Sequence, residues 1–309
     1  MRRLLLWMAR NSWLRRNIPR LWFAKRAVRK FMPGERAEDA LTAAAKFKDM
    51  QIPVIFTRLG ENLTRIEDAD ATAAAYHDLM AGAYARGIPA EPSVKLTQLG
   101  FDIDVERTLV HTKALADQAA AHDPHDVVWI DMEGSDYTES TIAFYERIKQ
   151  THPNVGLCLQ AYLKRTAADV ERLLPLAPKI RLVKGAYKES SEIAYQSRKD
   201  VDANYYALCA SMLTHVKDGR DLFLGLGTHD VDLIENVAGE AAALGLARTA
   251  FDIEMLYGIR ADQQRRLKSE GYNVRVLVAY GDYWYPWYMR RLAERPQNVI
   301  FALRQLLPW

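Results

Sequence analysis

Eight short apolar runs recur along the chain, and each ends in glycine or in polar residues. They start 24 to 43 residues apart, and the segments between them show helical periodicity. Because strands and helices alternate, we expect a parallel sheet, and eight such units can close an α/β barrel of the (βα)8 type. An open doubly wound sheet is the alternative, but no Gly-x-Gly-x-x-Gly follows the first run. The expected strands lie within residues 53–60, 92–100, 127–133, 155–162, 179–187, 222–230, 249–256 and 274–281.

The segment before the first run is basic and has no strand signal. A chain of 309 residues can form one barrel of roughly 250 residues and a small addition. Residues 1–30 hold ten Lys or Arg and no Asp or Glu. Breaks near Pro19 and at Pro33-Gly34 divide the segment into two or three helices. We therefore predict a basic N-terminal helical segment at 1–45, the arm, and a catalytic barrel at 46–309.

The arm also contains three tryptophans, Trp7, Trp13 and Trp22. Aromatic residues among arginines suit a membrane surface or a nucleic acid, and they equally suit the core of a small helical cap. Among external partners we expect peripheral membrane contact through residues 1–30 and no nucleic acid.

The remaining composition indicates a cytoplasmic protein. No apolar run approaches the ~20 residues that span a bilayer, and no cleavage site follows the short apolar start. Cys158 and Cys209 have neither disulfide nor metal spacing, so we expect both to be packing residues. The seven histidines include no His-x-x-x-His pair, and we predict no metal site. The expected location is the cytoplasm, with peripheral attachment to the inner face of the cell membrane through the arm.

Charged residues interrupt or follow several of the apolar runs. The run K-I-R-L-V-K-G-A-Y places Arg181 and Lys184 in an apolar strand, which rarely tolerates two cations without a buried anion. Asp131 ends another run, and Lys95, one strand earlier, is its expected partner. Active residues of such barrels lie at the carboxyl ends of the strands, so we expect one ligand site there. The residues at these ends are Lys95, Asp131, Gln160, Lys184, His229 and Glu254.

A pair of arginines follows the last run. Arg290 and Arg291 come after W-Y-P-W-Y-M, and Glu294 lies one helical turn further along. This pattern alone is typical of a solvated basic face with an intrahelical ion pair. Together with Lys95, the two arginines could instead clamp a carboxylate or a phosphate.

Seven of these motifs, in order, resemble those of bacterial monofunctional proline dehydrogenase. They are S-V-K-L-T, W-I-D-M-E, L-C-L-Q-A-Y, R-L-V-K-G-A-Y, G-T-H-D, E-M-L-Y-G-I-R and Y-P-W-Y-M-R-R-L-A-E-R-P. The likeness extends from about Phe31 to the last residue. It implies a distorted (βα)8 barrel that binds FAD, oxidises L-proline to Δ1-pyrroline-5-carboxylate and passes the electrons to a quinone.

The resemblance also implies roles for individual residues. The catalytic residues would be Asp131, which organises the basic cluster, and Arg181, which approaches the flavin N5 atom. Substrate would contact Lys95, Tyr187, Leu256, Leu277, Arg290, Arg291 and Glu294. The flavin would contact Met132, Gln160, Arg181, Lys184, Gly185, Ala186, Thr228, His229 and Glu254.

One position departs from the family pattern. Where the family places a tyrosine against the substrate, four residues before a glycine, this chain has Leu277 in the segment L-V-A-Y-G. A substituted proline such as hydroxyproline is therefore an alternative substrate. A Schiff-base, aldolase-like barrel using Lys184 is a second enzymatic alternative. A non-enzymatic alternative is a module in which the basic arm binds a membrane or a nucleic acid.

Overall fold

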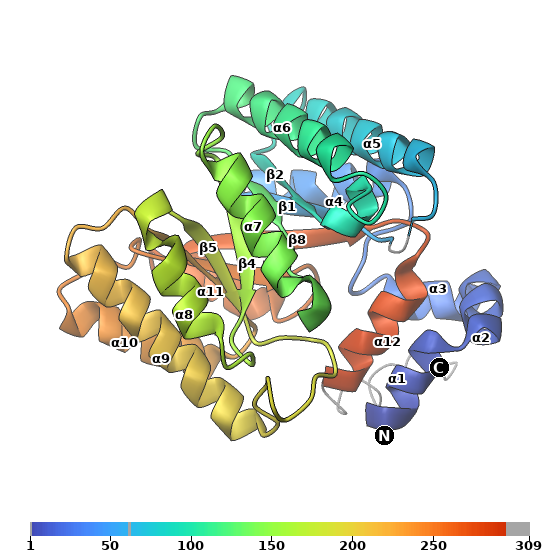
Figure 1. The fold of residues 1–309 in the computed structure, drawn as a ribbon. Helices are drawn as coiled ribbons and strands as arrows, with labels where there is room; N and C mark the ends of the chain where they lie inside the picture. Colours follow the sequence, from blue (N-terminus) through green and yellow to red (C-terminus); the bar gives the residue numbers. More distant parts are fainter. Residues whose placement is uncertain (1, 61–62, 295–309) are drawn as a thin grey trace.

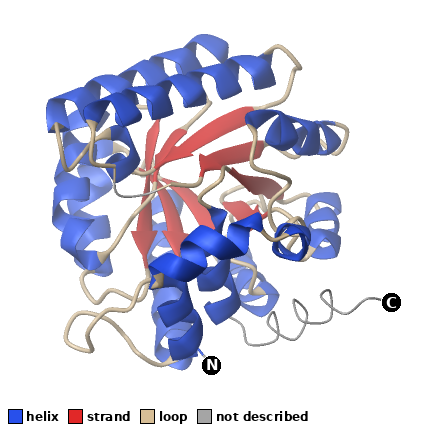
Figure 2. Ribbon diagram, turned by 90° about the vertical axis from the view of Figure 1, so that its right-hand side faces the viewer, coloured by secondary structure: helices blue, strands red, loops and turns tan. Residues whose placement is uncertain are grey.

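The structure, a computed structural model, describes residues 2–60 and 63–294. Eight parallel strands pair in sequence order, and β8 pairs with β1, so that the sheet closes into a barrel. Helices surround the strands (Figure 2). The predicted (βα)8 barrel is confirmed. The strands are β1 (Val54–Arg58), β2 (Ala90–Val94), β3 (Val128–Ile130), β4 (Val155–Gln160), β5 (Lys179–Val183), β6 (Phe223–Gly227), β7 (Asp252–Leu256) and β8 (Asn273–Tyr280).

Helices follow the strands and cover the outside of the barrel (Figure 1). Strand residues alternate between this outer surface and the barrel interior. Phe56 packs outward in one cluster with Leu79, whereas its neighbour Ile55 packs inside with Trp129 and Leu277. The helices are α5 (Ile66–Tyr84), α6 (Val105–His122), α7 (Thr138–Lys149), α8 (Thr166–Leu173), α9 (Arg198–Lys217), α10 (Val231–Ala243) and α11 (Ala261–Ser269). Short 3-10 helices are η2 (Leu96–Leu99), η3 (Ser135–Tyr137) and η4 (Leu174–Leu176).

The second strand lies earlier than the sequence predicted. The apolar run 92–100 suggested one strand, but β2 ends at Val94 and η2 follows. The hydroxyl and backbone N–H of Thr97 donate to Glu133, at 2.8 and 3.3 Å, which turns the chain away from the sheet. Gly100, with φ +101°, then ends η2. This turn leaves Lys95 directly beyond the end of β2.

Two helices depart from a regular barrel. α4 (Ala37–Lys48), which precedes the first strand, packs against β1, β8 and α5 and completes the outer ring of helices. The predicted boundary at residue 45 falls within it. α12 (Trp284–Glu294), which follows β8, does not occupy the ring. Trp287 and Arg291 of α12 instead line a cavity at the carboxyl ends of the strands.

Before α4, the arm contains α1 (Arg2–Arg10), α2 (Ser12–Asn17), η1 (Ile18–Arg20) and α3 (Trp22–Val28). α1 lies beside α12 (Figure 1), and Leu5 and Ala9 share a buried cluster with Trp284 and Tyr288. The other side of the arm is exposed. Its exposed apolar side chains are Leu4, Trp7, Trp13, Leu21 and Trp22. Within residues 2–60 and 63–294, no helix is both long enough and apolar enough to cross a membrane.

Candidate active site

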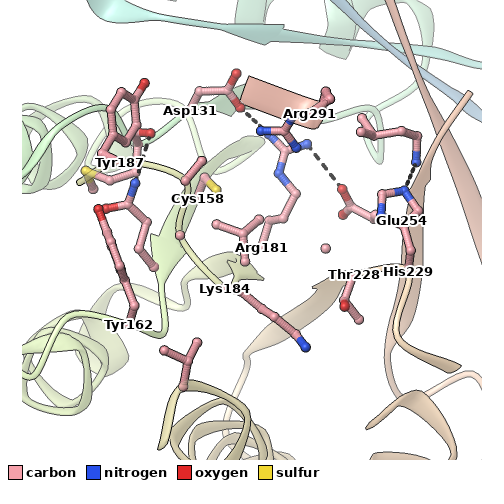
Figure 3. Close-up of a pocket in the computed structure, with 18 of the residues that line it drawn as sticks. Asp131, Cys158, Tyr162, Arg181, Lys184, Tyr187, Thr228, His229, Glu254 and Arg291 are labelled. Atoms are coloured by element: carbon pink, nitrogen blue, oxygen red, sulfur yellow. Dashed lines mark hydrogen bonds and ion pairs between the residues drawn. The ribbon is translucent and has the colours of Figure 1, made fainter. Parts of the chain in front are cut away.

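A cavity of about 500 Å³ lies at the carboxyl ends of the strands, and Trp287 and Arg291 of α12 line part of it. Figure 3 shows side chains that line this cavity. Most of the residues that the sequence singled out line it. They are Lys95, Asp131, Met132, Gln160, Arg181, Lys184, Gly185, Ala186, Tyr187, Thr228, His229, Glu254, Leu256, Leu277 and Arg291. Arg290 and Glu294 belong to α12, but their side chains lie outside the described part of the chain.

Asp131 forms the pair with Lys95 that the sequence predicted. Its Oδ2 accepts a hydrogen bond from Lys95 Nζ at 3.1 Å, and its Oδ1 accepts from Ser93 Oγ at 2.8 Å. Burial by itself would raise the pKa of Asp131, but the charges of Lys95 and Arg181 outweigh it and hold the pKa below its usual value. Asp131 is therefore a carboxylate that fixes two cations at the rim of the cavity.

Arg181 is buried between carboxylates from two other strands (Figure 3). Its guanidinium donates to Asp131 Oδ1 at 2.7 Å, to Ser93 Oγ at 2.6 Å and to Glu254 Oε2 at 3.2 Å. The guanidinium carbon also lies 4.9 Å from the centre of the Trp129 ring. These contacts supply the buried anions that a cation within an apolar strand requires.

Glu254 lies deeper than the sequence suggested. It was expected at the carboxyl end of its strand, but it is the middle residue of β7 and its side chain is 2% exposed. Burial raises its pKa to about 7; the charges of Arg181 and Arg275 oppose this shift, and those of Glu91 and Asp252 add to it. Gly225 provides its space, since a Cβ there would lie 2.5 Å from Glu254 Oε1.

A second group of charges inside the barrel was missed by sequence analysis. Arg275 donates to Glu91 Oε1 at 2.6 Å and to Asp252 Oδ2 at 2.5 Å. Glu91 also accepts from Trp129 Nε1 at 2.8 Å. These carboxylates lie two residues before Ser93 and Glu254, on the same face of their strands. Side chains on one face of a strand recur every two residues, and this period was the sequence signal that could have identified the second group of charges.

The loop after β5 forms one wall of the cavity. Gly185 has φ +108°, and a Cβ there would lie 2.3 Å from the Tyr162 ring, so only glycine fits. Further along, Glu189 accepts from the backbone N–H and the hydroxyl of Ser135, at 2.9 and 2.6 Å. This anchor ties the segment that carries Tyr187 to the loop after β3.

Lys184 is held by acids at the rim. Its Nζ donates to Asp230 Oδ2 at 2.8 Å and to a carboxylate oxygen of Asp202. Arg198 contacts the same two acids, with Nη2 2.9 Å from Asp230 Oδ2 and Nε 3.3 Å from Asp202 Oδ2. Lys184 and Arg198 therefore share the carboxylates of Asp202 and Asp230 at this rim.

Gln160 and His229 are oriented by backbone groups. Gln160 is buried, and its Nε2 donates to the carbonyl of Glu133 at 3.1 Å. Within the part of the chain that the structure describes, its Oε1 has no hydrogen-bond partner. The backbone N–H of Leu256 donates to His229 Nε2 at 2.9 Å, which leaves the ring proton on Nδ1. Gln160 thus presents a free acceptor, and His229 fixes the strand end that carries Leu256.

Cys158 and metal ligation need separate comment. Cys158 is buried in the core cluster and also lines the cavity, and burial raises its pKa to about 11. Cys209 is buried within α9. Among residues 2–60 and 63–294, no three His, Cys, Asp or Glu side chains are grouped so that they could hold a metal ion.

Comparison with known proteins places these features in a family. The family described as Proline dehydrogenase matches residues 40–303. The chain is 32% identical over 307 residues to Proline dehydrogenase 1 of Bacillus subtilis (strain 168), with 99% of both chains covered. It is 34% identical over 285 residues to the Proline dehydrogenase of Deinococcus radiodurans, covering 90% of this chain and 89% of that one.

Solved structures show the same fold. Proline utilization A (PutA) from Bdellovibrio bacteriovorus, inactivated by N-propargylglycine, superposes with a TM-score of 0.78 at 20% identity. A PutA mutant from Bradyrhizobium japonicum gives a TM-score of 0.73 at 23% identity. The matches cover 87% and 88% of this chain but only 32% and 31% of the PutA chains, so this chain spans about a third of their length.

Proposed function

The chain belongs to the proline dehydrogenase family, and on this premise we propose that it oxidises L-proline to Δ1-pyrroline-5-carboxylate with FAD and passes the electrons to a quinone. The proposal rests on three paired residues: Lys95 directly after β2, Asp131 directly after β3 and Arg181 on β5. All three line one cavity together with Arg291. Such a set supplies cations for a carboxylate and for a negative charge that develops during oxidation.

The cavity has groups that suit a flavin. The acceptor atom Gln160 Oε1 is buried without a partner among the described residues, as expected if a ligand N–H bonds to it. FAD supplies the hydride acceptor when bound. The proposed holding residues are Met132, Gln160, Arg181, Lys184, Gly185, Ala186, Thr228, His229 and Glu254, all of which line the cavity.

The substrate carboxylate is proposed to bind a group of cations that includes Lys95 and Arg291. Lys95 is held in place by Asp131, and Arg291 reaches the cavity from α12. Arg290 and Glu294 are proposed to complete this clamp. The side chains of Tyr187, Leu256 and Leu277 line the same cavity and would enclose the apolar ring. Fixed cations and an apolar wall together select a small cyclic amino acid.

The geometry of the cavity argues against one alternative function and leaves an alternative substrate open. A Schiff-base mechanism needs a neutral lysine, and the two carboxylates on Lys184 argue against it. A substituted proline remains a candidate substrate, because Leu277 lines the cavity and carries no hydroxyl. Leucine leaves more volume and fewer polar contacts than tyrosine at that position.

A membrane position is proposed for the arm. Trp7, Trp13 and Trp22 are 57%, 67% and 73% exposed, and residues 1–30 hold ten cations and no acid. Exposed tryptophans among cations suit the interface of an anionic membrane. Such contact would bring the barrel close to a lipid-soluble quinone at the inner face of the cell membrane.

The decisive experiment is a visible absorption spectrum. Protein purified with added FAD should show bound flavin, and anaerobic L-proline should bleach it. Product formation is checked in the same sample with a reagent for the cyclic imine. Protein that binds no FAD by equilibrium titration at tens of micromolar would rule out the flavin chemistry. Bleaching by trans-4-hydroxyproline but not by proline would instead favour the substituted substrate.

A further inference from the structure

The charges inside the barrel do not balance. Two groups of ion pairs are present: the Arg181 group, which is Lys95, Asp131, Arg181 and Glu254, and the Arg275 group, which is Glu91, Asp252 and Arg275. If every member were ionised, three cations would face four carboxylates. A buried excess negative charge is costly, and a proton bound to one carboxylate removes it.

The hydrogen bonds indicate which carboxylate takes up a proton most readily. Asp131 uses one oxygen for Ser93 and Arg181 and the other for Lys95. Both oxygens of Glu91 accept, from Arg275 and Val127 and from Trp129.

Asp252 follows the same rule, and Glu254 does not. Asp252 accepts from Asn273 at 2.9 Å on one oxygen and from Arg275 on the other. Among residues 2–60 and 63–294, Glu254 accepts only the 3.2 Å bond from Arg181, on Oε2. Its Oε1 is buried and has no partner among the described residues. The carboxylate with the fewest hydrogen bonds is the one that is most readily protonated.

Glu254 also lines the cavity, although its side chain is only 2% exposed. The charged and titratable groups around it come from the neighbouring strands and loops. They are Glu91 and Lys95 on and after β2, Asp131 after β3, Cys158 on β4, Arg181 and Lys184 on and after β5, His229 after β6, Asp252 on β7 itself and Arg275 on β8.

We propose that Glu254 is a proton-accepting counter-ion of Arg181. When negative charge enters the cavity, Glu254 binds a proton, and it then no longer compensates the positive charge of Arg181, which can attract the negative charge. With Glu254 and Asp131 both ionised, the two carboxylates balance the two cations Lys95 and Arg181. When Glu254 takes one proton from solvent in the cavity, the group has one net positive charge, which acts on the cavity. Glu254 acts through Arg181 and is therefore a positioning residue. The inference deepens the proposed function, because the negative charge it serves is that of the reduced cofactor.

The first test measures the flavin midpoint potential against pH in the holoenzyme. Between about pH 7 and pH 9, the wild-type potential should fall more steeply than that of Glu254→Gln. The difference is one proton per two electrons, and because a tenfold change of a two-electron equilibrium equals about 30 mV, it amounts to about 30 mV per pH unit. Asp252→Asn serves as the matched control, which should keep the steep region and move it to lower pH. Equal slopes in wild type and Glu254→Gln would overturn the proposal.

The second test needs no flavin. A carboxyl group whose pKa rises on folding stabilises the protein below its unfolded pKa of about 4.3, and this contribution is lost as the pH rises through the folded pKa. The denaturation midpoint of Glu254→Gln should therefore rise relative to that of wild type as the pH increases from about 5 to about 7. Above about pH 7, the difference between the two midpoints should stay constant. If Glu254→Gln does not fold, Glu254→Met is the second neutral variant. A constant difference across this range would overturn the inference. The expected change in a protein that binds no FAD would refute the proposed function while the Glu254 proton stands.

Discussion

Arg181 and Arg275 lie inside the same barrel, and each contacts two carboxylates, but of the two only Arg181 lines the cavity. Arg181 lines the cavity, and one of its carboxylates, Glu254, has an oxygen without a partner in the described structure. Arg275 lies away from the cavity, and both oxygens of Glu91 and of Asp252 accept hydrogen bonds. A closed network stabilises, whereas an open one can respond to charge that arrives from outside.

Trp129 contacts both groups. Its ring lies under the Arg181 guanidinium, and its Nε1 donates to Glu91. The difference teaches that buried ion pairs of similar geometry can serve stability in one place and chemistry in another. What distinguishes them is which polar atoms are left for a ligand.

The largest expected effect breaks the closed group. Arg275→Met leaves Glu91 and Asp252 as buried carboxylates without their cation. The free energy of unfolding should fall by about 3–5 kcal/mol, the cost of removing one partner of a buried pair. Urea denaturation measures it. The matched control is Arg266→Met, whose exposed pairs with Glu235 and Glu270 should be worth no more than about 1 kcal/mol. Equal losses in the two variants would show that the Arg275 group is not structural.

The second-largest effect is expected for Arg291, which lines the cavity from α12. Arg291→Met keeps most of the side-chain volume but removes the charge-assisted hydrogen bonds that we propose to the substrate carboxylate. We expect kcat/KM for proline to fall by at least ~10²-fold, on the order of 3 kcal/mol. Flavin content should stay unchanged. Steady-state kinetics with Arg266→Met as the control decides the matter, and unaltered kinetics would return Arg291 to the role of a solvated helix charge.

A smaller effect concerns the apolar wall. Leu277→Tyr adds a ring and a hydroxyl to the cavity, which should exclude substituents on the substrate ring. The ratio of kcat/KM for proline to that for trans-4-hydroxyproline should rise by an amount equivalent to about 1–3 kcal/mol. The ratio is measured in wild type and variant under the same conditions. An unchanged ratio would mean that Leu277 does not face the substrate ring.

The smallest effect per residue is expected for the cations and the exposed tryptophans of the arm. Flotation with liposomes should require anionic lipid and weaken with salt, because each surface cation contributes about 1 kcal/mol and salt screens it. Replacing Trp7, Trp13 and Trp22 with serine should reduce flotation, whereas Val110→Ser, which changes an exposed residue of α6, should not. Substitution is preferable to deletion, since α1 packs on α12. Equal flotation of both variants would refute membrane contact through the arm.

Much of the fold and part of the site followed from local patterns. Alternation of apolar runs and helical segments predicted the barrel, and the charge of Asp131 predicted its bond to Lys95. Glu254 was predicted as a site residue, but its position in the middle of β7 was not. The sequence does not show at which residue of an apolar run the strand ends and the cavity begins. Glu91, Asp252 and Arg275 were missed because each is a single charge at the start of an apolar run, where a solvated strand end is the simpler interpretation.

The sequence by itself determined the order of strands and helices and the residue types available at the strand ends, since both depend on local periodicity and on side-chain chemistry. Only the tertiary structure decided that α12 leaves the ring and lies over the cavity while α4 fills its place. The reason is that apolar faces can bury themselves against any complementary surface. Closure of the barrel likewise decided which charges meet: Arg181 pairs with residues 50 and 73 positions away. Neither local propensity nor spacing encodes such a contact.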